Sequence, residues 1–199
     1  KLISRYAAGR ILDAGCGTGY YLGSDSVGMD LSEGMLRKAM EKSGRACQAR
    51  IEQMPFREGS FDTAISMLAT LNFCPLRLAA AEISRVLKAG GRAMFSVATV
   101  YDGGYTFSEK RRAGDRREKK TQIQKKSFSM RLFSKDEIVR EFANNSMKLV
   151  HFDSVFILVN PEWGNFSQFP LKDRLLLGLE RLLPLKNYGC VYFFVFEKA

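Results

Sequence analysis

The residues with the clearest chemical meaning lie between positions 11 and 30. An apolar run that begins at Ile11 leads into a segment of alternating glycines, Gly15, Gly17 and Gly19. A chain that leaves a strand must turn sharply and let a ligand approach its backbone, and glycine allows both because it has no Cβ. Asp30 ends the next apolar run, where its carboxylate is placed to accept hydrogen bonds from ribose hydroxyls. The pattern predicts a binding loop for a nucleotide-type cofactor.

The spacing of the glycines distinguishes between cofactors. Dinucleotide-binding loops have the pattern G-x-G-x-x-G, whose third glycine would fall at Tyr20. Here the third glycine is Gly19, so the pattern is G-x-G-x-G. A tyrosine at the third position argues against a pyrophosphate site and therefore against a dinucleotide such as NAD.

The segment from Asp13 to Gly19 resembles motif I of the class I S-adenosylmethionine-dependent methyltransferases, in which the loop holds the methionine part of the cofactor. Later segments resemble further landmarks of this family in the same order. They are a ribose-binding strand end with the following helix start (27–36), the segment that enters the fourth strand (54–62) and the helix end before the fifth strand (82–92). Ala89 stands where the last landmark usually has proline. The match is strong over the first half of the chain, and over the second half the chain matches the family only in outline.

The resemblance implies S-adenosyl-L-methionine as the cofactor and S-adenosyl-L-homocysteine as the product. Nine residues are expected to bind the cofactor: Asp13, Gly15, Cys16, Gly17, Gly19, Asp30, Leu31, Ile51 and Met67. Within this set, Asp13 would orient the loop through its backbone amides and Asp30 would bind the ribose.

The adenine site departs from the family pattern. The acidic residue that accepts the adenine amino proton would align with Arg50, whose guanidinium has only donors. Adenine would then be held by the backbone around Ile51 and by packing against Met54. If the alignment shifts by two residues, Glu52 would serve instead.

Strand-like apolar runs alternate with helical segments, which predicts a parallel sheet with right-handed crossovers. Strands are expected at residues 10–14, 26–30, 46–49, 61–67, 92–98, 148–159 and 190–198. Ser32 should cap the second crossover helix, and Ser134 with Glu137 should form a capping box. The helix at 76–87 should end at Gly90, and the first crossover leaves room for one or two helical turns. With the resemblance, this predicts an α/β fold: a Rossmann-like, doubly wound, mostly parallel seven-stranded sheet with an antiparallel last strand and helices on both faces.

Length and composition predict a single domain over residues 1–199, because 46% hydrophobic residues suffice for a sizeable core. It would carry a basic insertion at about 102–130 and a lid-like segment at about 160–186. No run approaches the roughly 20 apolar residues of a membrane span and no signal peptide is visible, so we expect a cytoplasmic protein without integral membrane contact. Four scattered cysteines indicate neither a metal site nor disulfides. Few residues precede the first strand, which suggests truncation at that end.

Charge is concentrated in one stretch of the chain. Between Lys110 and Lys126 there are nine basic and two acidic residues, against a net charge of +10 for the whole chain. The cluster could attract RNA, because lysine and arginine neutralise phosphates. It could equally be a flexible, solvated loop, and the only aromatic residues near it are Phe107 and Phe128 at its flanks.

Three interpretations of the function remain open at this point. The first is a methyltransferase acting on a small or medium-sized acceptor, with a leucine-rich helix at 171–183 and an apolar loop at 163–169 as its lid. The second is a tRNA or RNA methyltransferase that uses the basic segment, and the third is a cofactor-binding protein without activity. Methyl transfer from a sulfonium needs two aligned centres rather than a dedicated base, so no catalytic residue is assigned.

Other polar residues near the expected ligand edge are weaker candidates. Asn72 follows the fourth strand and could orient a substrate or cap a helix, and Tyr101 and Asp102 follow the fifth strand. The single histidine, His151, lies in an apolar run and is interpreted as structural. The oligomeric state is left open.

Overall fold

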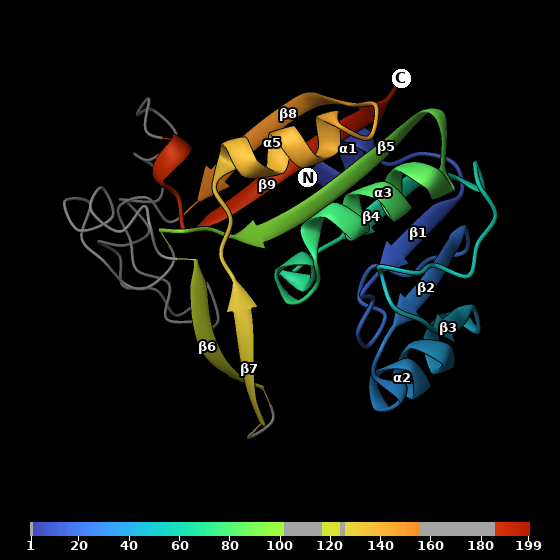
Figure 1. Ribbon diagram of the computed structural model, residues 1–199. Helices are drawn as coiled ribbons and strands as arrows, with labels where there is room; N and C mark the ends of the chain where they lie inside the picture. The colour runs from blue at the N-terminus through green and yellow to red at the C-terminus, as the bar shows by residue number, and fades with distance from the viewer. Residues whose placement is uncertain (1, 102–116, 124–125, 156–185) are drawn as a thin grey trace, which may run out of the picture.

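A computed structural model of the chain describes residues 2–101, 117–123, 126–155 and 186–199. Its centre is a seven-stranded sheet with the order β3-β2-β1-β4-β5-β9-β8 (Figure 1). The strands are β1 (Ile11–Ala14), β2 (Ser26–Asp30), β3 (Ala46–Gln48), β4 (Phe61–Ser66), β5 (Leu87–Ala98), β8 (Met147–Val155) and β9 (Val191–Lys198). The first five pair in parallel, whereas β9 runs antiparallel to β5 and β8. The predicted fold class is confirmed.

Helices lie on both faces of this sheet. The described helical elements are α1 (Leu2–Tyr6), α2 (Glu33–Ser43), η1 (Thr70–Phe73), α3 (Leu76–Val86), α5 (Lys135–Ala143) and η3 (Lys186–Tyr188). Successive strand residues point to opposite faces, so Phe95 of β5 packs in the main core while its neighbour Met94 packs in a second cluster. α3 and α5 cover the first of these faces and α1 covers the second.

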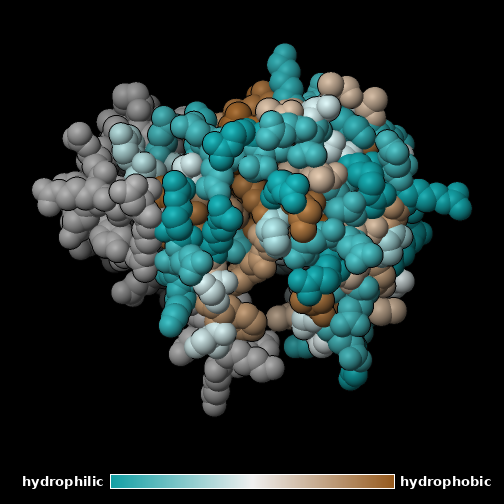
Figure 2. Space-filling view, in the orientation of Figure 1, coloured by the Kyte–Doolittle hydropathy of each residue, from teal (hydrophilic) through white to brown (hydrophobic). Residues whose placement is uncertain are grey.

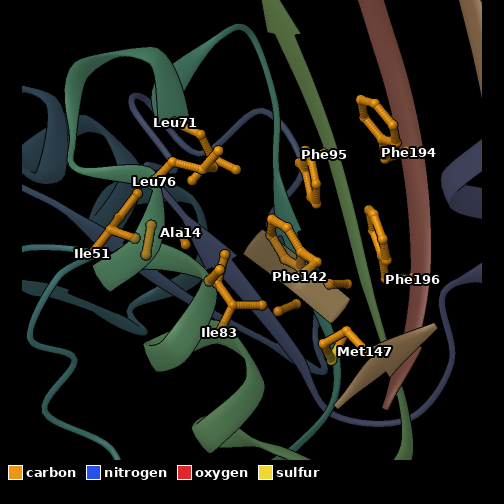
Figure 3. Packing of buried hydrophobic residues seen from close by; sticks show 14 of the residues in the cluster. Ala14, Ile51, Leu71, Leu76, Ile83, Phe95, Phe142, Met147, Phe194 and Phe196 are labelled. Carbon is orange, nitrogen blue, oxygen red and sulfur yellow. The ribbon is translucent and has the colours of Figure 1, made fainter. Parts of the chain in front are cut away.

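The main core is unusually aromatic where β5, β9 and α5 meet. Phe95 stacks on Phe142 of α5 with ring centroids 4.7 Å apart, and Phe142 lies 4.7 Å from Phe196 of β9. Phe194 joins the same stack, 5.4 Å from Phe95 (Figure 3). These large contacts attach the antiparallel strand and α5 to the centre of the sheet.

The end of α3 differs from the sequence prediction. The helix ends at Val86 rather than at the glycines, and Leu87 already begins β5. Lys198, at the end of β9, donates from Nζ to the carbonyl oxygens of Ser84 and Leu87, both at 2.8 Å. A distant lysine therefore satisfies the last helical carbonyls, and Gly90 instead supplies a positive φ of 72° within the strand that follows.

Both predicted N-caps are present, but the predicted capping box at Ser134 is incomplete. Ser32 accepts from the Met35 amide at the start of α2, and Ser134 accepts from the Glu137 amide at the start of α5. The carboxylate of Glu137 does not complete the capping box, because it accepts from Arg131 at 2.6 Å and Arg117 at 3.3 Å. Two cations outcompete the single backbone donor at Ser134.

Part of the basic segment is ordered, contrary to the expectation of a flexible loop. β6 (Glu118–Ile123) and β7 (Lys126–Arg131) form an antiparallel hairpin outside the main sheet. Met130 of β7 is buried with Ala69 and Leu132, and this burial attaches the hairpin to the body of the protein. Residues 102–116 and 124–125 of the segment lie outside the described residues.

The first crossover is also simpler than predicted. Between β1 and β2 the chain forms turns and no helix. The predicted strand at 148–159 is described only to Val155, and the lid-like segment at 160–186 lies outside the described residues except for its last position. No helix among the described residues is long and apolar enough to cross a membrane.

Candidate cofactor and acceptor site

A cavity lies at the carboxyl ends of β1, β2 and β3 and reaches the segment that follows β4. The strand order reverses between β1 and β4, and doubly wound sheets bind ligands at the carboxyl edge beside such a point. The walls of the cavity come from the glycine loop, the end of β2, the segment after β3 and η1. The lining residues are Gly15, Asp30, Leu31, Ala49, Arg50, Ile51, Glu52, Thr70, Phe73 and Cys74.

The glycine loop is tied to the end of β2 by its own backbone. The amides of Gly15 and Cys16 both donate to the carbonyl of Met29, at 2.7 and 2.9 Å. The Gly17 amide donates to Oδ2 of Asp30 at 2.9 Å, and the other oxygen of Asp30 accepts from Ser32 at 2.8 Å. Asp30 thus fixes the loop and the start of the next helix together.

Each glycine of the loop meets a different requirement. A Cβ on Gly15 would lie 2.2 Å from Cγ2 of Thr70, and one on Gly19 would lie 3.1 Å from Cα of Ala39 in α2. A Cβ on Gly17 would meet nothing within 4 Å, yet its φ is +55°, in the left-handed region that favours glycine. Gly15 and Gly19 therefore permit close packing, and Gly17 leaves its backbone open to a ligand.

Asp13 is a buried carboxylate below this loop. The residue is 1% exposed, and its Oδ2 has no hydrogen-bond partner among the described residues. Burial, followed by the negative charge of Asp30, raises the pKa of the Asp13 carboxyl to about 7. The loop amides of Gly15, Cys16 and Gly17 donate to other acceptors, so the predicted bonds from these amides to Asp13 are absent.

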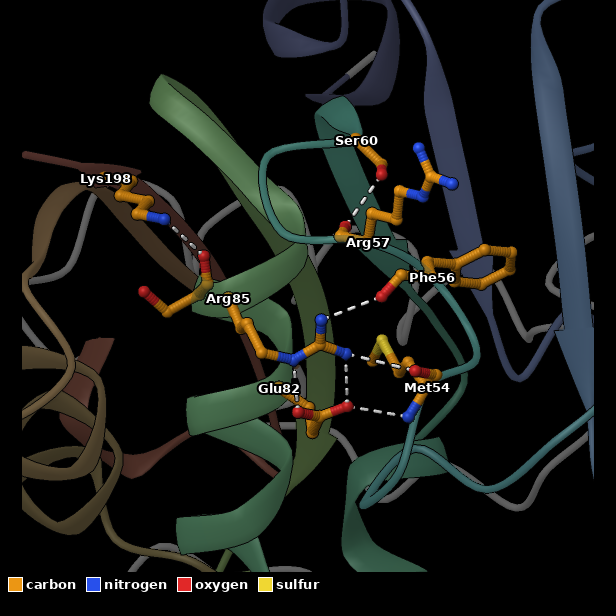
Figure 4. A network of polar contacts seen from close by, with 8 residues as sticks. Met54, Phe56, Arg57, Ser60, Glu82, Arg85 and Lys198 are labelled. Atoms are coloured by element: carbon orange, nitrogen blue, oxygen red, sulfur yellow. Dashed lines mark hydrogen bonds and ion pairs between the residues drawn. The ribbon is translucent and has the colours of Figure 1, made fainter.

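The wall after β3 is held in place by α3. Arg85 donates to the carbonyls of Phe56 at 2.7 Å and Met54 at 3.0 Å, while Glu82 accepts from the Met54 amide at 2.7 Å (Figure 4). Arg85 and Glu82 also pair with each other at 2.6 Å, and this hydrogen bond is the main reason that the pKa of Glu82 is lowered. Two sequence landmarks far apart in the chain are therefore one structural unit, which positions the segment that carries Arg50.

Arg50 and Glu52 meet at the cavity wall. Nη2 of Arg50 lies 3.2 Å from Oε1 of Glu52, whose side chain is 14% exposed. Both residues and Ile51 line the cavity, so both alternatives for adenine, the Ile51 backbone and the Glu52 carboxylate, are brought to one place.

The opposite wall begins with a strained turn. Leu68 and Ala69, directly after β4, have φ values of 58° and 63°, which cost about 1–3 kcal/mol each in non-glycine residues. Ser96 of β5 holds the turn, since its hydroxyl accepts from the Leu68 amide and its carbonyl accepts from the Ala69 amide. Thr70 and Phe73 of η1 then line the cavity.

Comparison with known proteins supports the family that the sequence motifs resemble. Residues 12–95 match the family model described as a methyltransferase domain. The resemblance to class I S-adenosylmethionine-dependent methyltransferases is confirmed. The matched residues contain the glycine loop, Asp30 and every residue that lines the cavity.

Two relatives and one solved structure show how far the similarity extends. An uncharacterized protein of Methanocaldococcus jannaschii is 43% identical over 95 residues, covering 46% of this chain and 38% of the relative. The malonyl-[acyl-carrier protein] O-methyltransferase of Erwinia pyrifoliae is 42% identical over 98 residues, 45% of this chain and 37% of the relative. A crystal structure described as a putative S-adenosylmethionine-dependent methyltransferase from Listeria monocytogenes shares the fold, with a TM-score of 0.68, 16% identity and coverage of 96% of this chain and 90% of that one. The chain spans well under half the length of the two curated relatives.

The structure brings some of the nine predicted residues together. Gly15, Asp30, Leu31 and Ile51 line the cavity, and Gly17 bonds to Asp30 at its edge. The others lie behind this surface: Asp13 below the loop, Cys16 and Gly19 against α2, and Met67 in the cluster with Ile65 and Met94. Sequence reasoning missed Thr70, Phe73 and Cys74, because η1 carries no motif.

His151 and Tyr101 lie away from the cavity lining. The ring of His151 lies 5.5 Å from that of Tyr6 in α1, and the ring of Tyr101 lies 5.3 Å from that of Tyr188. Asp102 lies outside the described residues. In the described part of the chain, no group of three or more metal-ligating side chains comes together.

Asn72 neither lines the cavity nor caps a helix. Its side chain is 1% exposed, and its amide nitrogen donates to the carbonyls of Ala98 at 2.8 Å and Arg131 at 2.5 Å. Its carbonyl oxygen accepts from the Ala98 amide at 2.9 Å. Asn72 therefore joins η1, β5 and β7, and long-range backbone groups saturate the side chain.

Replacement of Asn72 by alanine should destabilise the protein by about 3 kcal/mol, because it leaves buried backbone groups of Ala98 and Arg131 without a partner. Urea unfolding monitored by circular dichroism measures the change. Asn144→Ala, at an exposed position that ends α5, is the matched control and should have little effect. Equal stability of the two variants would contradict the role assigned to Asn72.

Proposed function

We propose that the cavity binds S-adenosyl-L-methionine and that the protein transfers its methyl group to an acceptor, releasing S-adenosyl-L-homocysteine. The observation that carries this proposal is the pair of carboxylates at the glycine loop, with Oδ2 of Asp13 buried and unpartnered. Ionising a buried carboxyl group without a partner is costly, and a positive charge bound at the loop above Asp13 would favour the ionised form. A dinucleotide would instead bring an anionic pyrophosphate to the glycine loop, above Asp13.

The residues present fit this cofactor group by group. Gly17 has open space in front of its backbone for the methionine part, and Asp30 at the cavity wall provides acceptor oxygens for ribose hydroxyls. Ile51 and Glu52 line the part of the cavity where the adenine would lie. Bound there, the cofactor supplies a methyl carbon activated by positive sulfur, so that an acceptor lone pair bonds to carbon as the carbon–sulfur bond breaks. The protein has to align the two centres and exclude water.

We further propose a small or medium-sized molecule as the acceptor. The relative from Erwinia pyrifoliae is named for a malonyl group on acyl-carrier protein, and its match covers 45% of this chain. The family model ends at residue 95, before the hairpin and the lid-like segment that would contact an acceptor.

Acceptor-dependent release of S-adenosyl-L-homocysteine tests the proposal. The purified protein is incubated with S-adenosyl-L-methionine and pools of carboxylic acids, phenols, amines and tRNA, and the product is quantified by mass spectrometry. We expect release with at least one small-molecule pool and its loss in Asp30→Asn. Tight cofactor binding without release in any pool would favour a non-catalytic binding protein.

Transfer to RNA remains a second candidate because of the hairpin. β6 and β7 place Lys119 and Lys120 on the same hairpin as Phe128, which is 41% exposed. A basic surface with an exposed aromatic ring is suited to single-stranded nucleic acid. Against this, charge alone gives weak, sequence-independent binding, and the Phe128 ring already contacts Phe73.

Neutralising Arg111, Arg112, Arg116 and Arg117 to glutamine should leave cofactor affinity intact and change methylation of the acceptor little. Arg117 pairs with Glu137 at the surface, a contact that contributes at most about 1 kcal/mol, so the fold should survive. Turnover is compared with that of the parent at low and moderate salt. A large loss of turnover, with steep salt dependence in the parent, would make nucleic acid the leading acceptor.

A further inference from the structure

A hollow next to the cofactor cavity is bordered by apolar side chains that the cofactor does not require. Phe73 lines the cavity and is 41% exposed, and its ring lies 6.3 Å from that of Phe128 in β7, which is also 41% exposed. Figure 2 shows this face of the molecule hollowed beside the hairpin, with hydrophobic residues around the opening. Phe73 therefore links the cavity wall to Phe128 of the hairpin.

A third exposed apolar side chain belongs to the strained turn that precedes η1. Leu68 is 72% exposed although it lies only two residues after the buried strand β4. Its neighbour Ala69 packs in one cluster with Met130 of β7, so the turn and the hairpin are in direct contact. A left-handed backbone at a large apolar residue persists only when its surroundings impose it, and such outliers concentrate at ligand sites.

The hairpin is built to present Phe128 on this side. In the antiparallel register Thr121 pairs with Phe128 and Lys119 pairs with Met130, so the two pairs share one face of the hairpin. Met130 of that face is buried against Ala69. The same face therefore carries Phe128 next to η1, at the carboxyl edge where the methyl group would be offered.

We propose that this hollow, bordered by Leu68, Phe73 and Phe128, binds the methyl acceptor, and that the acceptor presents an apolar ring or hydrocarbon group to it. The inference rests on the proposed function, because it identifies the acceptor side of the same site. Fully polar acceptors, such as sugars or short amino acids, would leave the exposed parts of these three apolar side chains in water. The acceptor atom would then lie between the apolar hollow and the cofactor cavity.

Binding of 2-naphthoate, a flat apolar ring system that fluoresces, tests the proposal. Its affinity is measured by fluorescence anisotropy with saturating S-adenosyl-L-homocysteine, for the parent and for Phe128→Ala, Phe128→Leu and Leu68→Asn. Asparagine tolerates the left-handed backbone at position 68, so that variant removes the apolar side chain and keeps the turn. Val150→Ala, at a 44% exposed position in β8 at the far edge of the sheet, is the control.

We expect Phe128→Ala and Leu68→Asn each to weaken naphthoate binding about tenfold, as for loss of an apolar anchor. Phe128→Leu should retain most of the affinity, and Val150→Ala should equal the parent. Calorimetry should show unchanged S-adenosyl-L-homocysteine affinity in all four variants.

Failure of the acceptor inference and failure of the proposed function would give different results. Equal naphthoate affinity in the parent, Phe128→Ala and Leu68→Asn, or no binding by the parent, would overturn the acceptor inference while cofactor binding stands. Absence of S-adenosyl-L-homocysteine binding by the parent would overturn the proposed function, whatever the naphthoate result.

Discussion

Replacement of Asp30 by alanine should weaken S-adenosyl-L-homocysteine binding by about 1.5–3 kcal/mol, roughly 10- to 150-fold. Two losses combine in this variant. The ribose loses its charged acceptor, and the amides of Gly17 and Ser32 lose the carboxylate that fixes the loop to the end of β2. Isothermal titration calorimetry measures the affinity.

Asp25→Ala is the matched control for Asp30→Ala. Asp25 is exposed and lies just before the other end of β2. This variant should bind with the affinity of the parent. If Asp30→Ala also bound with unchanged affinity, the carboxylate would have no part in cofactor recognition.

Asp13 should make the ligand-free protein less stable as the pH rises. Its pKa is raised to about 7 in the folded protein from 3.8, so between these values the folded state binds more protons than the unfolded state. The contribution of Asp13 to the free energy of unfolding is therefore largest below pH 3.8. It falls as the pH rises through 7, by up to about 4 kcal/mol.

Urea unfolding of the ligand-free protein at pH 5 and pH 8 checks this dependence. Asp13→Asn removes the titrating group and should be more stable than the parent at pH 8, with a smaller difference at pH 5. Asp62→Asn is the control, because its hydrogen bond with Lys88 lowers the pKa of Asp62 and the resulting pH dependence has the opposite sign. A parent whose stability rises from pH 5 to pH 8, with no gain in Asp13→Asn, would contradict the assignment.

The parts of the fold that were predictable are those encoded by local pattern. Strand β2 was predicted with its exact bounds, because an apolar run between turn residues is readable without tertiary information. The cap at Ser32 was equally local. The antiparallel last strand needed the family resemblance, since alternating strands and helices predict only a parallel sheet, and the strand order came from the structure.

The parts that were missed depend on contacts between distant residues. At the end of α3, Lys198 donates to the backbone carbonyl of Leu87, although the two residues are 111 positions apart in the sequence. Asn72 reaches Arg131 on β7, 59 residues away, and no spacing rule indicates such a bond. The β6–β7 hairpin escaped notice because its lysine-rich strands resemble a solvated loop, although Met130 is buried.

The candidate site likewise has one part that local pattern predicts and one part that depends on contacts between distant residues. The glycines and Asp30 were identified from their motif, and the structure places Gly15 and Asp30 on one cavity. The wall from Thr70 to Cys74 follows a strained turn that Ser96 stabilises from a neighbouring strand. A single sequence does not encode that support in any local pattern, so this wall of the cavity appeared only with the structure.

Calorimetric titration of the ligand-free protein with S-adenosyl-L-homocysteine and, separately, with NAD tests the central claim most directly. The carboxylates of Asp13 and Asp30 at the glycine loop predict saturable one-to-one binding of S-adenosyl-L-homocysteine and no measurable heat with NAD at the same concentrations. Tighter binding of NAD, or binding of neither ligand, would contradict the account.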